Sequence, residues 1–209
     1  MTQDLKALYG AEAEAQRARY AALNTAFAEA FGAAEALEYF SAPGRTEVGG
    51  NHTDHNNGKV LAAAVNLDVI AAVKKTENGV IRLKSAGYPM DTVDTAELSV
   101  QESEKERSAA LIRGVCARLK ALGYKVGGFD AVTASRVLKG SGLSSSAAFE
   151  VLVVTILSHL YNGGAIAPVE AAQISKYAEN VYFGKPSGLL DQMAASVGGF
   201  TTVSYTHLR

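Results

Sequence analysis

The chain has 209 residues, of which 48% are hydrophobic, and its net charge is −1, so it can build one large domain with a real core but lacks the charge excess typical of nucleic-acid or anionic-membrane surfaces. A single cysteine, Cys116, excludes an internal disulfide framework and fits a reducing compartment. No run of about 18 apolar residues occurs, and the acidic, alanine-rich start has no signal-peptide core, which predicts a cytoplasmic protein without membrane or nucleic-acid partners.

The first half of the chain predicts one helix followed by strands. Apolar residues at helical spacing predict a helix over residues 12–31. Its apolar stripe consists of Tyr20, Leu23, Phe27 and Phe31. Short strands are expected over residues 37–40 and 60–65. Segments 68–74 and 80–84 flank an Asn-Gly pair, which favours positive φ angles and predicts a β-hairpin.

The second half alternates helices and strands irregularly. An amphipathic helix is expected over residues 104–122, ended by Gly123, and a strand within 126–138. Its inward residues should be Ile112, Val115, Leu119 and Leu122. The elements expected next are an apolar helix ending at 162–164, a helix over 168–180, a loop over 184–188, a short helix carrying Asp191 and Met193, and a strand over 200–205. Irregular alternation with an early hairpin is typical of the α+β class rather than of a doubly wound sheet.

A glycine- and serine-rich segment stands directly before the apolar helix. It reads Gly140-Ser141-Gly142-Leu143-Ser144-Ser145-Ser146. The glycines allow a tight turn and a close ligand approach, and the serines stand where a helix begins and its free N–H groups attract phosphate. The lysine of a Walker A loop is absent. The segment is therefore either a phosphate cradle of another kind, with a hydroxyl for Mg²⁺, or a plain turn that caps the helix.

A second polar segment, residues 41–58, lies between the first two expected strands. It contains Arg45, Asn51, His52, Thr53 and Asp54. Asp, Asn and His side chains together supply both donors and acceptors, which suits a site that reads hydroxyl groups. A solvated loop with glycine turns is the alternative.

The two segments together resemble the GHMP kinases, and within them the galactokinases. That family has an Ala-Pro-Gly-Arg stretch, then a His-Thr-Asp stretch, then a Gly-Leu-Ser-Ser-Ser loop entering a helix, all present here in that order. A third match is Ala178-Glu179-Asn180 followed by Gly188-Leu189-Leu190-Asp191-Gln192-Met193. The resemblance covers residues 40–200 and implies the GHMP kinase fold, which is α+β with an N-terminal ribosomal-protein-S5-like domain.

The resemblance also implies roles in phosphoryl transfer from ATP. Asp191 would be the catalytic base and Arg45 the cation beside it. Residues 140–146 would bind the ATP phosphates, and Ser146 with Glu179 would ligate Mg²⁺. Taken without the resemblance, Asp191 is typical of a helix-start cap, Arg45 of a surface salt bridge and Glu179 of an exposed helix glutamate.

The sugar would be read by Asn51, His52, Thr53 and Asp54, with the backbone of Gly188 approaching it. Asp54 would accept hydrogen bonds from neighbouring hydroxyls, a pattern that rejects epimers. His52 has the alternative of a structural loop contact. The expected substrates are galactose and ATP, the expected product is galactose 1-phosphate, and the full-length protein is expected to be a monomer.

The segment that should read the sugar departs from the commonest galactokinase pattern. Asn51 stands where an acidic residue is usual, and His55 where tyrosine is usual. These differences leave two alternatives, another GHMP kinase acting on an N-acetylated amino sugar, or a non-catalytic galactose and ATP sensor. Retention of the base, its arginine and the metal-binding pair argues against the sensor, because a sensor needs no base.

The family's glycine-rich third motif, which belongs to the C-terminal half, does not occur within the 209 residues. We therefore expect one N-terminal GHMP kinase domain over residues 1–209, with the C-terminal domain largely missing and the chain inactive alone. Residues 203–209 do not resemble the family's continuation and are expected to be a non-native tail.

Overall fold

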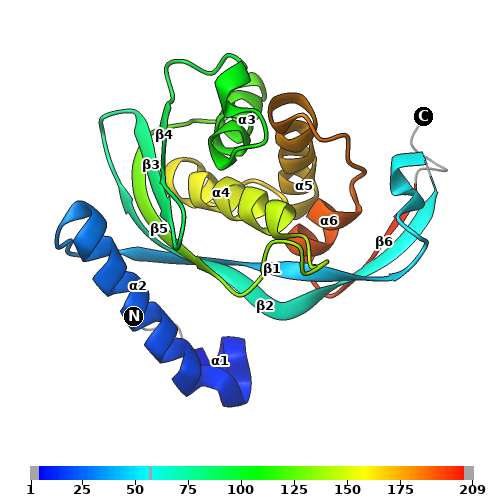
Figure 1. Ribbon diagram of the computed structural model, residues 1–209, viewed down its shortest axis with the longest axis horizontal. Coiled ribbons are helices and arrows are strands. Elements are labelled where there is room, and N and C mark those ends of the chain that lie inside the picture. The colour runs from blue at the N-terminus through cyan, green and yellow to red at the C-terminus, as the bar shows by residue number, and fades with distance from the viewer. Residues whose placement is uncertain (1–4, 57, 205–209) are drawn as a thin grey trace.

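The computed structural model describes residues 5–56 and 58–204, and in this part of the chain six strands form one mixed sheet (Figure 1). The strands are β1 (Glu38–Gly49), β2 (Lys59–Lys75), β3 (Val80–Ser85), β4 (Met90–Asp94), β5 (Phe129–Ser135) and β6 (Phe200–Ser204). The helices are α1 (Leu5–Tyr9), α2 (Ala13–Phe31), α3 (Ser108–Ala121), α4 (Ser145–Asn162), α5 (Pro168–Tyr177) and α6 (Leu190–Val197). A π-helical segment, η4 (Ala178–Phe183), continues α5, and the short 3₁₀ turns are η1 (Gly10–Glu12), η2 (Thr53–Asn56) and η3 (Glu102–Glu104). The predicted α+β class is confirmed.

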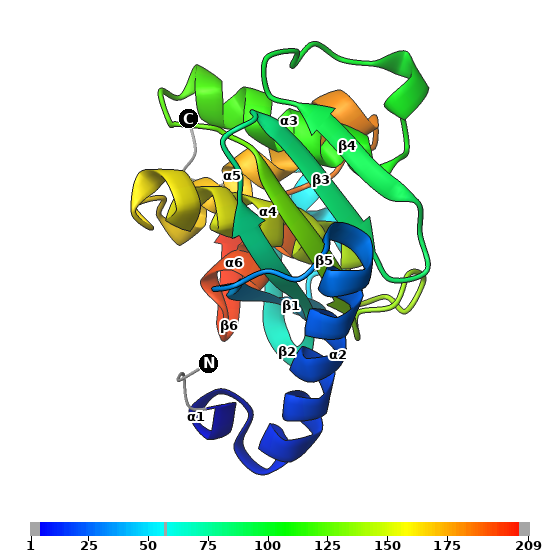
Figure 2. The same ribbon diagram turned by 90° about the vertical axis from the view of Figure 1, so that its left-hand side faces the viewer.

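Helices cover both faces of the sheet (Figures 1 and 2). On one face, α2 packs its buried side chains against Ile70 and Val132. These side chains include Tyr20, Leu23 and Phe27. On the other face, α3, α5 and α6 form a layer together with α4, which is largely buried among them. The predicted stripe of α2 is thereby confirmed as core packing, although Phe31 at its end is only half-buried.

The strand order is β1–β2–β5–β3–β4, with β6 paired to the first residues of β2. The predicted hairpin between residues 68–74 and 80–84 is wrong, because β5 lies between these strands, antiparallel to β2 and parallel to β3. The turn itself does form, since Asn78 Oδ1 accepts a hydrogen bond from Val80 N at 3.0 Å and Gly79 has a φ of +70°. The nearly wholly buried β5 takes the central position, so burial between distant segments overrides the local turn signal.

β2 is one strand where the sequence predicts two. The polar residue Asp68, at the start of the second expected strand, is buried inside β2. Its carboxylate accepts hydrogen bonds from Arg19 Nη1 at 2.7 Å and from Tyr9 Oη at 2.6 Å. These partners compensate the burial of the charge, so the strand continues through it.

β1 is longer than predicted and carries part of the polar segment. It runs to Gly49 instead of ending at Phe40, with register shifts on either side of Arg45. Arg45 therefore lies on a strand, which fixes the direction of its side chain, and not in the loop that the sequence suggested.

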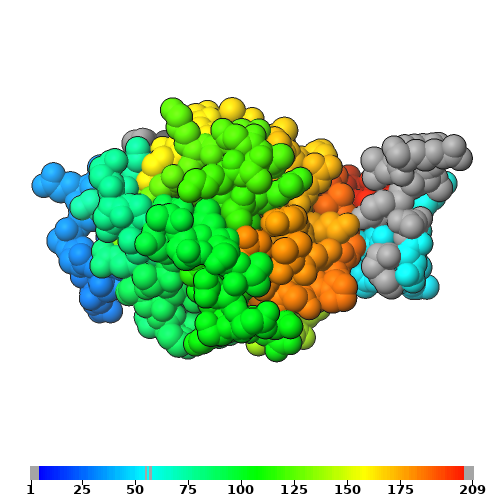
Figure 3. All heavy atoms as spheres, turned by 90° about the horizontal axis from the view of Figure 1, so that it is seen from above, coloured from blue at the N-terminus to red at the C-terminus, as the bar shows by residue number. Residues whose placement is uncertain are grey.

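α3 packs closely against the segment that carries Glu179. A Cβ on Gly114 of α3 would come within 2.8 Å of the Cα of Ala178, and the green and orange surfaces of these two segments adjoin in Figure 3. Glycine at position 114 thus lets η4 approach the helical layer. The helix ends at Ala121, so Leu122, predicted to face inward, is exposed.

The remaining elements follow the sequence with few exceptions. α4, α5, α6 and β6 occur where they are predicted, whereas α1 and β4 were not predicted. No helix of the described residues is long and apolar enough to cross a bilayer. Of the expected tail, Val203 and Ser204 belong to β6, and residues 205–209 lie outside the described residues.

Candidate active site

Two parts of the chain that are far apart in sequence meet at one pocket of about 320 Å³. The first part is β1 with the turn between β1 and β2, and the second is the loop that leads into α6 with the first turn of that helix. The lining residues are Arg45, His52, Asp54, Lys185, Pro186, Ser187, Gly188 and Asp191. The sequence singled out Arg45, His52, Asp54, Gly188 and Asp191, and the fold brings these five together although the first and last are 146 positions apart.

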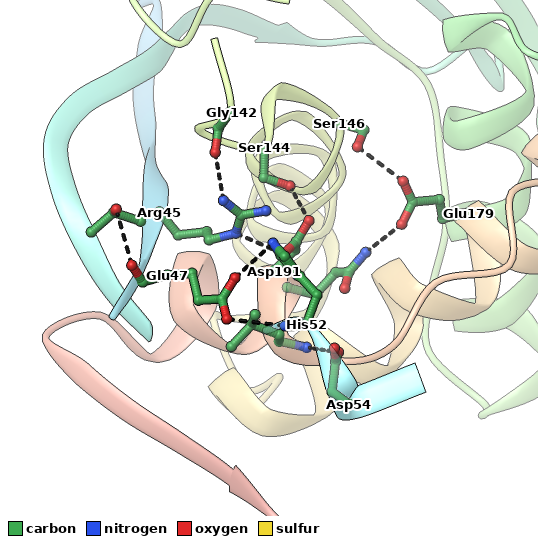
Figure 4. A network of polar contacts seen from close by, with 12 residues as sticks. Arg45, Glu47, His52, Asp54, Gly142, Ser144, Ser146, Glu179 and Asp191 are labelled. Carbon is green, nitrogen blue, oxygen red and sulfur yellow. Dashed lines mark hydrogen bonds and ion pairs between the residues drawn. The ribbon is translucent and has the colours of Figure 1, made fainter. Parts of the chain in front are cut away.

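Asp191, in the first turn of α6, is held from two sides (Figure 4). Arg45 Nε donates to Asp191 Oδ1 at 2.6 Å, and Ser144 Oγ donates to Asp191 Oδ2 at 2.5 Å. Arg45 Nη1 also donates to Gly142 O at 2.6 Å. Burial opposes ionisation, but the hydrogen bond and charge of Arg45 and the hydroxyl of Ser144 outweigh it and lower the pKa of Asp191 below its usual value. The pocket therefore contains an ionised carboxylate in a fixed orientation.

The Gly/Ser loop, residues 140–146, packs against β1 and leads into α4. Leu143 O accepts a hydrogen bond from Arg45 N at 3.0 Å, and a Cβ on Gly44 would lie 2.9 Å from the same carbonyl oxygen. Three residues with positive φ turn the loop sharply. They are Gly140 (+80°), Gly142 (+76°) and Ser144 (+59°). A left-handed serine is uncommon, and such backbone conformations cluster at ligand sites, which supports a binding role for the loop beyond capping α4.

Asp54 joins residues 51–54, the segment expected to read the sugar, to the start of α6. Its carboxylate is buried and accepts a hydrogen bond from Leu190 N at 2.9 Å. Gly188 lies so close that a Cβ there would be 1.8 Å from Asp54 Oδ2. The predicted approach of the Gly188 backbone to the site therefore has a steric basis, because any side chain at this position would displace Asp54.

The other residues of this segment lie at the turn after β1. His52 N donates to Glu47 Oε1 at 3.0 Å, and His52 Nε2 lies 3.1 Å from Glu47 Oε2. Thr53 Oγ1 donates to Gly50 O at 2.8 Å and closes the turn, while Asn51 is exposed with a φ of +51°. Neither Asn51 nor Thr53 is among the described residues that line the pocket, and their assignment to the sugar stays a prediction.

Ser146 and Glu179, the expected metal pair, are in direct contact beside the pocket (Figure 4). Ser146 Oγ donates to Glu179 Oε1 at 2.9 Å, and Lys185 Nζ lies 3.0 Å from the same oxygen. Burial alone would lower the pKa of Lys185, but its hydrogen bond to Glu179 and the charge of that carboxylate raise it. The described residues contain no cluster of three His, Cys, Asp or Glu side chains suited to a metal. A hydroxyl and one carboxylate are nevertheless the donors that Mg²⁺ takes when phosphate and water complete its shell.

A second carboxylate, Glu150 of α4, is fully buried near Glu179. Gln192 Nε2 donates to Glu179 Oε2 at 2.8 Å and to Glu150 Oε2 at 3.2 Å. Burial, and then the negative charge of Glu179, raises the pKa of Glu150 well above its usual value. Glu150 Oε1 and Gln192 Oε1 are buried acceptors without a hydrogen-bond partner in the described part of the chain, and a proton on Glu150 supplies a donor for such a pair.

We expect Glu150→Gln to raise the melting temperature at neutral pH. Because the pKa of Glu150 is higher in the folded state, its contribution to stability is fully present below the unfolded pKa and is lost as the pH rises toward the folded pKa, at about 1.4 kcal/mol per pH unit. Glutamine stays neutral at every pH and keeps a donor and an acceptor. Thermal melts from acidic to mildly alkaline pH check this, with the exposed Glu14→Gln as control. Superimposable pH profiles of wild type and Glu150→Gln would contradict it.

The pocket-lining role of residues 185–187 and the buried pair Glu150 and Gln192 were not predicted from the sequence. Two signals were available. Lys185 stands in a short loop between the motifs of Glu179 and Asp191, so it must lie near both. Glu150 interrupts an otherwise apolar run, where an unpaired glutamate is rare.

Two family models match the chain. The galactokinase galactose-binding signature matches residues 25–75, and the N-terminal domain of the GHMP kinases matches residues 110–199. These ranges contain the turn with Asp54 and the segments with Ser146, Glu179 and Asp191.

Curated relatives and solved structures agree with the family models. The galactokinase of Clostridium tetani is 32% identical over 176 residues, which are 84% of this chain and 44% of that protein. The galactokinase of Streptomyces coelicolor is 36% identical over 170 residues, 81% of this chain and 43% of that protein. The crystal structure of Lactococcus lactis galactokinase complexed with galactose has a TM-score of 0.83 at 30% identity, covering 91% of this chain and 50% of that one.

A more distant structure shares the fold alone. Methanococcus jannaschii mevalonate kinase has a TM-score of 0.68 at 17% identity, covering 81% of this chain and 54% of that one. The chain spans less than half the length of the curated relatives it matches.

Proposed function

This chain belongs to the GHMP kinase family, in which it matches the N-terminal portion of the galactokinases, and we propose that it supplies the sugar pocket and the catalytic base of a kinase that phosphorylates galactose on its anomeric hydroxyl. The observation that carries this proposal is the carboxylate of Asp191, fixed by Arg45 at 2.6 Å in a pocket lined with groups that bond hydroxyls. ATP is the phosphoryl donor, and galactose 1-phosphate is the product.

Asp191 accepts the proton of the anomeric hydroxyl while that oxygen attacks the γ-phosphorus and the bond to ADP breaks. Its lowered pKa makes it a weak base, but phosphoryl transfer has a loose transition state in which positioning counts more than basicity. Arg45 and Ser144 orient both carboxylate oxygens. The guanidinium of Arg45 also places a permanent positive charge between the base and the Gly/Ser loop.

The pocket offers the sugar both acceptors and donors. Asp54 and Asp191 accept hydrogen bonds, and His52 and Arg45 donate them. Asp54 is buried and anchored through Leu190 N, so it cannot turn to suit another epimer. A sugar that leaves such a group unpaired is rejected strongly.

The nucleotide side of the site is the Gly/Ser loop with the first turn of α4. Ser146 and Glu179 would hold Mg²⁺. Their oxygens lie 2.9 Å apart, and both are hard donors of the kind that Mg²⁺ prefers. When bound, the metal neutralises charge on the phosphates. Gln192 donates to Oε2, the other oxygen of Glu179, and orients this carboxylate, while the buried Glu150 accepts from the same amide nitrogen.

The test is phosphorylation of a panel of sugars by the full-length protein with Mg²⁺ and ATP, measured as sugar-dependent ADP release. We expect galactose to have the highest kcat/KM, with glucose and N-acetylgalactosamine much lower. A clear preference for N-acetylgalactosamine would replace galactose by an N-acetylated amino sugar. Tight binding of galactose without ADP release would support a sensor instead.

We expect Ser146→Ala to weaken binding of Mg·ATP by about tenfold or more, since it removes one of the few protein oxygens near the metal. Galactose affinity should stay unchanged, because Ser146 does not line the sugar pocket. Isothermal titration with each ligand measures both. The matched control is Ser196→Ala, whose hydroxyl bonds Pro168 O on another surface of α6. Unchanged Mg·ATP affinity and turnover would mean that Ser146 does not bind the metal and belongs only to the turn at the start of α4.

A further inference from the structure

Lys185 connects the sugar pocket with the expected metal pair. It lines the pocket together with Asp191 and Asp54, and its Nζ lies 3.0 Å from Glu179 Oε1. That oxygen also accepts the hydroxyl of Ser146 at 2.9 Å. The ammonium group therefore occupies one side of the carboxylate oxygen that would ligate Mg²⁺.

The loop that carries Lys185 is anchored at both ends. Gly184 N and Lys185 N donate to Glu179 O at 3.0 and 3.1 Å, with Gly184 in a left-handed conformation. Further along, Asn180 Oδ1 accepts hydrogen bonds from Ser187 N at 3.0 Å and Ser187 Oγ at 2.9 Å. These hydrogen bonds fix the backbone of Lys185 beside Glu179. The side chain of this lysine is the part that can change position.

The two partners differ sharply in exposure. The side chain of Glu179 is 1% exposed, whereas that of Lys185 is 53% exposed. A buried carboxylate needs a counter-charge, and Lys185 supplies one in the absence of a metal. The lysine can leave toward water at little cost, because its four-carbon stem is flexible and its ammonium is easily hydrated.

We propose that Lys185 holds the metal position at Glu179 until the nucleotide arrives, and that Mg²⁺ then displaces its ammonium into the sugar pocket. This inference rests on the proposed function for the identity of the metal. An ammonium and a divalent cation repel each other on one carboxylate oxygen, so the two positions of Lys185 are alternatives. Displacement leaves the lysine among the pocket residues, where it adds positive charge beside Asp191 at the moment that the triphosphate is bound.

Metal affinity tests this without any turnover. Mn²⁺, a spectroscopic substitute for Mg²⁺, is titrated by electron paramagnetic resonance into the full-length protein saturated with ADP. Lys185→Met removes the competing charge and should tighten Mn²⁺ binding by about fivefold or more, while Lys185→Arg should stay close to wild type. Lys125→Met is the matched control, because Lys125 is exposed and its backbone bonds Asn162 at the far end of α4. Unchanged or weaker Mn²⁺ binding by Lys185→Met would overturn the proposal.

Amine labelling provides a second measurement that does not depend on the variant folding. Acetic anhydride labels wild-type lysines in proportion to the freedom of the amine, and Mn²⁺ with ADP should increase labelling of Lys185 relative to Lys125. Equal or reduced labelling of Lys185 would contradict displacement. Neither readout requires a sugar. A protein that fails to phosphorylate galactose but shows both effects would contradict galactose as the substrate and still support the exchange of Lys185 for the metal.

Discussion

Asp191→Asn should lower kcat by about 10³-fold while leaving the affinities for galactose and Mg·ATP nearly unchanged. The amide cannot accept the proton of the attacking hydroxyl, yet it keeps the shape of the carboxyl. Its oxygen can still accept from Arg45 Nε, and its nitrogen can donate to Ser144 Oγ, which turns from donor to acceptor. Single-turnover kinetics with the full-length protein separate this loss of chemistry from any change in binding.

Asp68→Asn is the matched control for the loss of an arginine-paired carboxylate. Asp68 is buried on β2 and pairs with Arg19 at 2.7 Å, but it contacts α1 and α2 and does not line the pocket. Its substitution should lower the melting temperature and leave kcat within a small factor of wild type. A kcat of Asp191→Asn close to that of wild type would show that Asp191 is not the base.

Gly188→Ala should weaken galactose binding strongly. The new Cβ would lie 1.8 Å from Asp54 Oδ2, so the carboxylate must move away and release Leu190 N at the start of α6. We expect KM for galactose to rise by about tenfold or more, because a displaced or unpaired acceptor costs about 1–3 kcal/mol. Loss of the hydrogen bond between Leu190 N and Asp54 should cost about 0.5–1.5 kcal/mol of stability as well.

Gly49→Ala is the control for this substitution. Gly49 ends β1, and a Cβ there meets nothing within 4 Å. Steady-state kinetics and thermal melts of both variants should show a defect for Gly188→Ala alone. A Gly188→Ala protein with wild-type KM for galactose would mean that Asp54 does not touch the sugar.

The residues of the candidate site could be found from the sequence because their motifs are short and contiguous. Arg45, Asp54, Ser146, Glu179 and Asp191 each lie in such a motif, and the resemblance to one family relates the motifs to one another. Spacing alone could not have brought Arg45 and Asp191 together, because their contact depends on the whole sheet and on α4 and α6.

The parts that the sequence did not reveal depend on contacts between distant segments. The insertion of β5 between β2 and β3 is set by burial, and no local pattern encodes it. The continuity of β2 through Asp68 depends on Arg19 and Tyr9, which belong to other elements. Lys185 was missed because its importance comes from the contact with Glu179, which a π-helical turn creates.

The most direct test of the proposed function is the identity of the product. Full-length protein, Mg²⁺, ATP and galactose are incubated together, and phosphorus NMR with coupling to the sugar protons locates the new phosphate. The proposed role of Asp191 as the base in a galactose kinase predicts a phosphate on the anomeric oxygen, formed by wild type and not detectably by Asp191→Asn. A phosphate on another hydroxyl, or no phosphorylated galactose at all, would contradict the account.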